Sequence, residues 1–96
     1  MVNTMNKNLV NVADMVSLIG AEDTHAMLVS ALTRSEAVVK FRKVSDGSER
    51  VMPCTLQPEA IPESISQPST SQLVCYSTED EGWRSFRVDS LISVQF

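Results

Sequence analysis

FRKVSDGSERVMPCTLQPEAIPE (Phe41–Glu63) and WRSFRVDSLISV (Trp83–Val94) are the two segments that decide the predicted fold. Apolar and polar residues alternate along much of each segment, and this period of two is typical of β-strands. The first segment is interrupted by Asp46-Gly47, a dipeptide favoured in two-residue type I′ turns, where both positions have positive φ. It therefore predicts a β-hairpin, and the second segment predicts a further strand and a short closing strand.

A two-residue turn at Asp46-Gly47 also predicts the register of the hairpin. The expected apolar pairs are Phe41 with Met52, Val39 with Cys54, and Ala37 with Leu56. All six side chains fall on one face, so the turn and the hydrophobic pattern agree. In this register Pro53 lies opposite Lys40 in a non-hydrogen-bonded pair, and its missing N–H points away from the first strand. We expect the second strand to be an edge, or to be bent or bulged, on that other side.

The N-terminal residues have the period of a helix instead. Apolar side chains three or four positions apart are Met5, Leu9, Val12, Val16 and Ile19. This spacing predicts a helix from about Lys7 to Ile19, which Gly20 is suited to end. A second helix is expected to begin at a cap of Asp23 or Thr24 and to end near Arg34. Its apolar face carries Met27, Leu28, Ala31 and Leu32.

The remaining residues predict an irregular connection and three short strands. Prolines among polar residues indicate a long loop from Gln57 to Ser71. Strands are expected at residues 73–76, 83–88 and 92–96, with a turn at 78–82 and a 3₁₀ turn at 89–91. Together the elements predict a mainly β fold in one compact domain. It consists of a small five-stranded SH3-like or Sm-like β-barrel over residues 36–96, preceded by one or two short helices in residues 1–35.

Composition limits the class of protein. Ninety-six residues, 43% of them hydrophobic and 21% charged, are enough for one domain with a modest core. No apolar run approaches the roughly 18 residues of a membrane-spanning helix, and the N-terminus lacks the apolar core of a signal peptide. We therefore expect a cytoplasmic protein with no membrane partner.

Residues that carry enzyme chemistry are few and scattered. His25 is the only histidine, and with Cys54 and Cys75 it offers no close pair of metal ligands. In a reducing compartment these two cysteines, placed inside expected strands, are predicted to be buried thiols and not a disulfide. His25 is interpreted as a structural helix residue. We expect no enzyme activity, no cofactor and no metal.

The distribution of charge is uneven. The net charge of −4 argues against non-specific binding to nucleic acid. From Ala37 onward, however, the basic residues all fall in expected strands: Lys40, Arg42, Lys43, Arg50, Arg84 and Arg87. Two interpretations remain open. The cations form a basic barrel wall with an acidic rim, or they are solvated strand charges that prevent edge-to-edge aggregation.

A binding surface is predicted around Trp83. Along its strand, Trp83 shares one face with Arg87, whereas Phe86 shares the other with Val88 and is expected in the core. An exposed Trp beside Arg suits base stacking or a protein hot spot. The alternative is that Trp83 covers the end of the barrel and that Arg87 pairs with Asp89 or a loop acid. The candidate binding residues are Lys40, Arg42, Arg50, Trp83, Arg84 and Arg87.

The hairpin and the closing strands also share residues with a known family. These residues are Phe41, Lys43, Asp46-Gly47, Arg50, Met52, Cys54-Thr55-Leu56, Pro58-Glu59, Ile61-Pro62 and Trp83-Arg84-Ser85-Phe86-Arg87-Val88-Asp89-Ser90. Through them, residues 38–94 resemble the small WYL-like family of tailed-phage proteins. The resemblance implies an Sm-like SH3 β-barrel fold and an intracellular phage protein without an established activity.

A weaker similarity concerns LVCYSTEDEGWRSFRVDSLISV (Leu73–Val94). This segment is similar to the closing strands of the larger WYL domains of bacterial transcription regulators. In those domains a basic, arginine-bearing surface is thought to bind ligand or nucleic acid. The Trp-Tyr-Leu tripeptide that names them is absent from this sequence.

Three functions are predicted from these observations. The leading one is a non-enzymatic phage accessory or regulatory module that binds a host or phage protein in the host cytoplasm. The alternative is a barrel that binds single-stranded RNA through its basic strands, as Sm-like barrels often do. The third is self-association into a ring, or a minor virion component.

Overall fold

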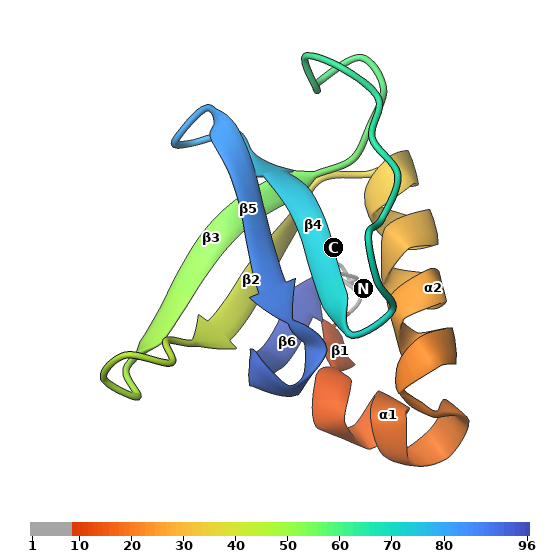
Figure 1. Ribbon diagram of the computed structural model, residues 1–96, viewed down its shortest axis with the longest axis vertical. Helices are drawn as coiled ribbons and strands as arrows, with labels where there is room; N and C mark the ends of the chain where they lie inside the picture. Colours follow the sequence, from red (N-terminus) through yellow and green to blue (C-terminus); the bar gives the residue numbers. More distant parts are fainter. Residues whose placement is uncertain (1–8) are drawn as a thin grey trace, which may run out of the picture.

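The structure is a computed structural model and describes residues 9–96. Six strands form one antiparallel sheet in the order β1-β6-β2-β3-β4-β5, with two helices beside it (Figure 1). Along the chain the elements are β1 (Leu9–Asn11), α1 (Val12–Ile19), α2 (Ala21–Arg34), β2 (Ala37–Arg42), β3 (Glu49–Thr55), β4 (Gln72–Ser77), β5 (Gly82–Arg87), a 3₁₀ helix (Val88–Ser90) and β6 (Leu91–Gln95). The predicted layout of helices followed by a mainly β region is confirmed, as is the 3₁₀ turn before the last strand.

The predicted five-stranded closed barrel is wrong in two respects. The sheet has six strands, and it does not close on itself. The additional strand is β1, in which Val10 pairs with Val94 of β6. β1 thereby occupies the edge of β6 that closure would have paired with β5. At the opposite end of the order, β5 pairs with β4 alone among the described residues.

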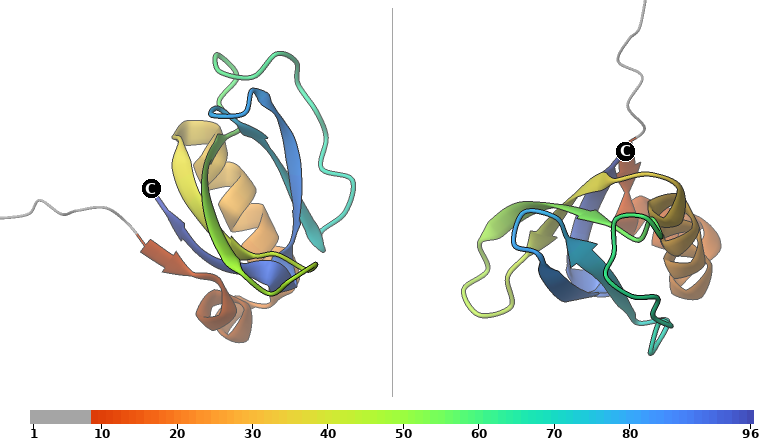
Figure 2. Two further views of the ribbon diagram at one scale, coloured as in Figure 1. Left: turned by 90° about the vertical axis from the view of Figure 1, so that its left-hand side faces the viewer. Right: turned by 90° about the horizontal axis from the view of Figure 1, so that it is seen from above.

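The sheet is bent so strongly that β4 and β5 lie over β2 and β3 (Figure 2). The rings of Phe41 on β2 and Phe86 on β5 have centroids only 4.7 Å apart, although two strands separate β2 from β5 in the order. α2 lies against the sheet and contributes Leu28 and Leu32 to the same core. The buried apolar residues are Val12, Leu28, Leu32, Ala37, Val39, Cys54, Leu56, Leu73, Cys75, Phe86, Val88, Leu91 and Val94.

The register of the β2–β3 hairpin differs from the prediction by two residues. The observed pairs include Phe41 with Arg50, Val39 with Met52, and Ala37 with Cys54. The loop spans residues 44–47 because only Gly47 takes a positive φ, of +74°, and its N–H donates to the carbonyl of Lys43 at 2.9 Å. Asp46 does not take the positive φ that a type I′ turn requires. A shift of two keeps each side chain on its predicted face, so the core assignment survives the error.

β3 and β4 meet at two positions only, Cys54 opposite Ser77 and Thr55 opposite Tyr76. The next residue outward is Pro53, which has no N–H to continue this ladder. The prediction that the far side of β3 is irregular near Pro53 is therefore confirmed, although its partner on β2 is Val38 and not Lys40. The outer part of β3 pairs with β2 alone.

α1 is shorter than predicted. The helix expected from about Lys7 begins only at Val12, because the residues before it form β1. The side-chain oxygen of Asn11 accepts a hydrogen bond from the N–H of Asp14 at 3.0 Å and caps the helix. Residues before position 9, including Lys7, lie outside the described part of the chain. Gly20 ends α1, as predicted.

α2 begins at Ala21, ahead of the caps predicted at Asp23 or Thr24. Gly20, with a φ of +91°, turns the chain between the two helices. The hydroxyl of Thr24 donates to the carbonyl of Gly20 at 2.7 Å and so holds this corner. α2 ends at Arg34, as predicted. In the described part of the chain, neither helix is long and apolar enough to cross a membrane.

Both cysteines are buried in the core as free thiols, as predicted. Cys54 lies on β3 and Cys75 on β4, near the point where the two strands meet. The hydrogen bond between the thiols, together with burial, raises the pKa of Cys75. This thiol therefore stays protonated at neutral pH and acts as a small core side chain.

Candidate functional site

A groove opens between the β2–β3 hairpin and the edge strand β5. We call it the β2–β5 groove; its volume is about 370 Å³, within the range of sites that bind small ligands. It is lined by Phe41, Arg42, Lys43, Val44, Ser45, Met52, Arg84, Ser85, Phe86, Arg87 and Ser90. None of these residues is acidic, although the chain has a net charge of −4.

The floor of the groove is apolar. Phe41 and Met52 are half-buried and pack against the core, and Phe86 is buried opposite them on β5. The two phenyl rings are tilted by 48°, an arrangement that aromatic pairs favour. Val44, at the tip of the hairpin, is 80% exposed. An apolar ligand side chain that enters the groove would therefore lose contact with water on several sides.

The cations of the lining come from both borders of the groove. They are Arg42, Lys43, Arg84 and Arg87. Among the described residues no acidic side chain pairs with Lys43. The other three each contact one carboxylate from a residue outside the lining.

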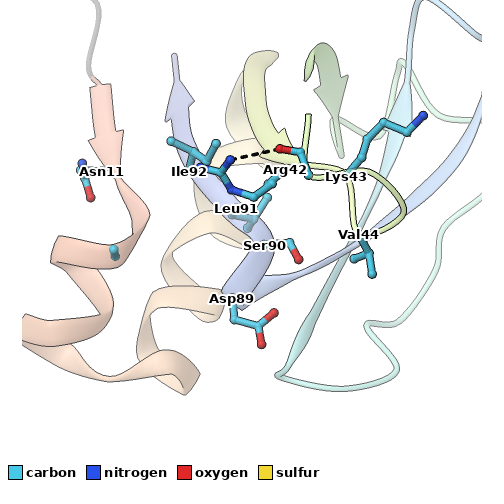
Figure 3. A pocket seen from close by; sticks show the side chains of 10 residues that line it. Asn11, Arg42, Lys43, Val44, Asp89, Ser90, Leu91 and Ile92 are labelled. Carbon is cyan, nitrogen blue, oxygen red and sulfur yellow. Dashed lines mark hydrogen bonds between the residues drawn. The ribbon is translucent and has the colours of Figure 1, made fainter. Parts of the chain in front are cut away.

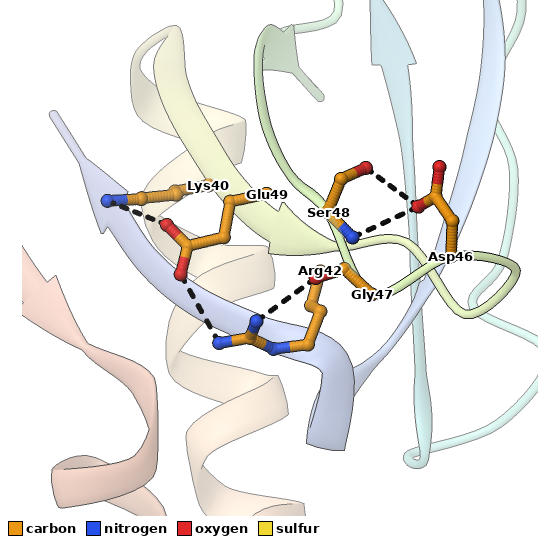
Figure 4. Close-up of polar contacts among 6 residues, drawn as sticks. All are labelled: Lys40, Arg42, Asp46, Gly47, Ser48 and Glu49. Carbon is orange, nitrogen blue, oxygen red and sulfur yellow. Dashed lines mark hydrogen bonds and ion pairs between the residues drawn. The ribbon is translucent and has the colours of Figure 1, made fainter.

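On the hairpin, one carboxylate serves two cations. Glu49 lies 3.3 Å from both Lys40 and Arg42 (Figure 4). Arg42 also donates to the carbonyl of Gly47 at 3.1 Å. All of these side chains are about half exposed, and exposed ion pairs contribute only about 0–1 kcal/mol each. The contacts therefore orient the guanidinium of Arg42 without removing its charge from the surface.

On β5, each arginine has its own acid. Arg84 donates to the carboxylate of Asp80 at 3.0 Å and to the carbonyl of Trp83 at 2.8 Å. Arg87 donates twice to Asp89, at 2.9 and 3.1 Å, which matches one of the pairings considered for it in the sequence. The Arg84–Asp80 pair is about half exposed, and the Arg87–Asp89 pair is largely open to solvent. A stronger acidic ligand can therefore compete for these arginines.

The structure brings only part of the predicted binding set together. Three of those residues line the groove: Arg42, Arg84 and Arg87. Lys40 lies beside Glu49 outside it, and Arg50 is exposed on β3. Trp83 packs edge-on against Tyr76 with ring centroids 5.3 Å apart, and it does not line the groove. The expected surface of a stacking Trp beside arginines is therefore not assembled at this groove.

The sequence pattern missed the floor of the groove. It assigns Phe86 to the core, and it places Phe41 and Met52 on the apolar face of the hairpin without any sign that they border an opening. It also leaves Lys43 outside the candidate set. The available signal is its position directly after Arg42 at the end of β2, where it joins the same basic stretch.

The hairpin tip is held by Asp46. One of its carboxylate oxygens accepts hydrogen bonds from the N–H of Ser48 at 3.0 Å and from its hydroxyl at 2.7 Å (Figure 4). These bonds hold the pKa of the Asp46 carboxyl below its ordinary value. An ordered turn thus presents Lys43 and Val44 at the border of the groove.

A second hollow, of about 450 Å³, lies between the hairpin tip, the 3₁₀ helix and the start of α1 (Figure 3). Its lining includes Arg42, Lys43 and the acidic Asp89. Because both signs of charge are present, this hollow selects less strongly for a charged ligand than the β2–β5 groove does. It also lacks the aromatic floor.

Comparisons with known proteins identify no family for this chain. No protein-family model, no curated protein and no solved structure matches it. The resemblance to the WYL-like phage family therefore stays a prediction. Within residues 9–96, no three His, Cys, Asp or Glu side chains gather in a way that would hold a metal ion.

Proposed function

We propose that this chain is a non-enzymatic module that binds a protein partner through the β2–β5 groove. The observation that carries the proposal is an apolar floor lined by four cations and no acid. Protein interfaces commonly combine a desolvated apolar centre with a polar rim, and arginine is enriched in them. The net charge of −4 disfavours general attraction to polyanions, so a specific protein surface suits the groove better.

The family resemblance supports a narrower form of this proposal. In that form the chain is an accessory or regulatory factor of a tailed phage, and the partner is a host or phage protein in the host cytoplasm. This origin rests on likeness and not on the chemistry of the groove. Protein binding at the groove and phage origin are therefore separate hypotheses.

Single-stranded RNA is the second candidate. Six of the eight basic residues lie on β2, β3, β5 or the hairpin turn: Lys40, Arg42, Lys43, Arg50, Arg84 and Arg87. Such clustering is the electrostatic pattern of a phosphate-binding surface. Against it, four of these cations already contact carboxylates, and Trp83 is half-buried and packs against Tyr76 outside the groove.

Capture from a nuclease-treated bacterial lysate tests the protein-binding proposal. The wild-type chain is compared with Lys43→Glu in the groove and with Arg34→Glu on α2, a matched reversal of charge outside the groove lining. We expect a stoichiometric protein that wild type and Arg34→Glu retain and that Lys43→Glu loses by about tenfold, because the variant places an acid in a lining whose charged residues are otherwise all cations. Quantitative mass spectrometry measures the captured amounts.

The contrary outcomes are distinct. Equal retention by the two variants would place the partner elsewhere on the surface. Capture that disappears with nuclease, together with a salt-sensitive mobility shift of oligouridylate that Arg84→Ala and Arg87→Ala abolish, would replace protein binding by RNA binding. Light scattering tests the third function, because a strictly monomeric chain excludes a ring.

A further inference from the structure

β5 offers the longest uncovered strand edge in the described part of the chain. It pairs with β4 from Gly82 to Arg87, and no strand within residues 9–96 pairs with its other side. An uncovered edge presents a row of N–H and C=O groups that can template a further strand. β5 also stands at the end of the sheet order, so no described strand of the sheet lies where a further strand would add.

Two other edges of the sheet, those of β6 and β4, are covered by the chain itself. β1 pairs with the free edge of β6. Where β3 does not reach β4, the side-chain amide of Gln67 bonds both the N–H and the carbonyl of Val74, at 2.9 and 2.8 Å. Nε2 of His25 lies 2.8 Å from the carbonyl of Gln72. The chain thus satisfies the polar groups of these edges internally. On β5, the side chain of Arg84 bonds the carbonyl of Trp83 at 2.8 Å, and from Ser85 to Arg87 no comparable cover lies on the edge within residues 9–96.

The uncovered edge runs along the β2–β5 groove. Residues 84–87, four consecutive positions of β5, all line it. Side chains of an added strand alternate between the two faces of the sheet. Every second residue would therefore point toward Phe41 and Met52, and the residues between them would lie on the face of Ser85 and Arg87. An occupant of this site should alternate in polarity.

Charge indicates which residues should alternate with the apolar ones. The lining contributes cations from the hairpin and from β5 and contributes no acid. Lys43 in particular has no acidic partner among the described residues. Asp or Glu in the occupant would be attracted here, and Lys or Arg would be repelled.

We propose that the β2–β5 groove binds an extended acidic segment of the partner protein, which adds to β5 as a further strand and places alternate apolar side chains over Phe41 and Met52. This inference rests on the proposed function and specifies the chemistry of the partner. Main-chain hydrogen bonds to β5 give the affinity, and the apolar floor and the cations give the specificity. The aliphatic spacing of the segment, and not its charge alone, selects it.

Two synthetic peptides as long as β5 test the inference on the full chain. One alternates Asp and Val, and the other has the same composition with all Asp residues first and all Val residues last. We expect the alternating peptide to bind about tenfold more tightly, because only alternation places every Val on the groove side of the added strand. Fluorescence anisotropy measures both affinities. NMR should show more slowly exchanging amides at Ser85 and Arg87, whose N–H groups face away from β4, and little change in exchange at Phe86, whose N–H faces β4.

N-methylation separates strand addition from attraction between side chains. Only every second amide of an added strand faces β5. Methylation of one alternate set of peptide amides should abolish binding, and methylation of the other set should change the affinity by less than about twofold. Equal effects of the two methylated peptides would contradict strand addition. Lys43→Glu should weaken the alternating peptide, and Arg34→Glu should not.

The results for the inference and for the proposed function can be told apart. Equal affinity of the alternating and block peptides, or binding of neither, overturns the inference even if a protein is captured at the groove. Peptide binding that Lys43→Glu leaves unchanged also overturns it. Self-association that competes with the peptide would make a second copy of the chain the occupant. Selective binding of the alternating peptide, without any captured protein that Lys43→Glu loses, would support strand addition at β5 and contradict the proposed function.

Discussion

Asp46 and Gly47 act differently at the tip of the β2–β3 hairpin. Gly47 takes a φ of +74°, whereas Asp46 accepts two hydrogen bonds from Ser48 with one carboxylate oxygen. A short acidic side chain can form such a local turn with the residue two positions on, and this competes with the type I′ turn expected of the dipeptide. The competition lengthens the loop and moves the register of the hairpin by two residues.

We predict that the carboxyl of Asp46 titrates below its ordinary pKa of 3.8 and that Ser48→Ala raises this pKa by removing the hydroxyl donor. Because the pKa is lowered in the folded state, the resulting stabilisation is present above the unfolded-state pKa and is lost as the pH falls through the folded-state pKa. NMR titration of the carboxyl carbon measures both values. Ser45→Ala, in the same loop, is the control and should leave the pKa unchanged. An unshifted Asp46 in the wild-type chain would contradict the prediction.

At the scale of elements, β4 depends on groups outside the sheet. β3 reaches it at two positions only, and Gln67 and His25 bond backbone groups of its remaining edge. The sequence predicts His25 as a structural helix residue, and at 5% exposure on α2 it is buried there, as that interpretation requires. Gln67 carries no such signal, because a glutamine in a Pro- and Ser-rich loop is usually solvated.

Replacement of Gln67 tests this cover. We predict that Gln67→Ala speeds the amide exchange of Val74 and lowers the free energy of unfolding by about 1–3 kcal/mol, since two backbone groups lose their partner. Gln67→Glu keeps an acceptor for the N–H of Val74 and removes the donor to its carbonyl. Amide protection should therefore persist in Gln67→Glu while stability falls. Exchange at Val74 that is unchanged in Gln67→Ala would show that the loop does not protect β4.

For the whole molecule, the helices and the sheet share one core. Leu28 and Leu32 of α2 belong to the same buried cluster as residues of β2, β3, β4, β5 and β6. The boundary drawn near residue 35 from the change of period therefore separates two types of secondary structure but does not separate two cores. Loss of packing in α2 should therefore lower the stability of the whole sheet.

A pair of matched Leu→Ala variants tests this coupling. Leu28 is fully buried, and Leu18 is 78% exposed. We predict that Leu28→Ala lowers the free energy of unfolding by about 2–5 kcal/mol, because a cavity remains in the core. Leu18→Ala should change it by less than about 0.5 kcal/mol.

Two probes decide whether the molecule unfolds as one unit. Helix circular dichroism follows the N-terminal elements, and the fluorescence of Trp83, the single tryptophan, follows β5. In Leu28→Ala the two transitions should coincide, as cooperative unfolding requires. A helix signal that melts before the fluorescence changes would mean that α1 and α2 fold independently of the sheet.

Local sequence determined the positions and faces of most elements of this protein. The period of two placed β2 to β6 nearly where they lie, Gly20 ended α1, and Phe86, Val88 and both cysteines fell in the core as expected. These features depend on a residue and its near neighbours in the chain, so the local sequence pattern is enough to predict them. Three of the five candidate cations also line the β2–β5 groove, because they lie on strands that border it.

Tertiary structure alone decided which strand edges are covered and which remain free. The pairing of β1 with β6, the two-position contact at Pro53 and the cover of β4 by Gln67 all join residues far apart in the chain. Many strand edges with similar hydrogen-bonding groups compete to pair with each other. Which edges pair depends on the whole fold, so it cannot be predicted from a local sequence pattern. The sheet therefore stays open, and the opening turns the core residues Phe41, Met52 and Phe86 into the floor of a groove.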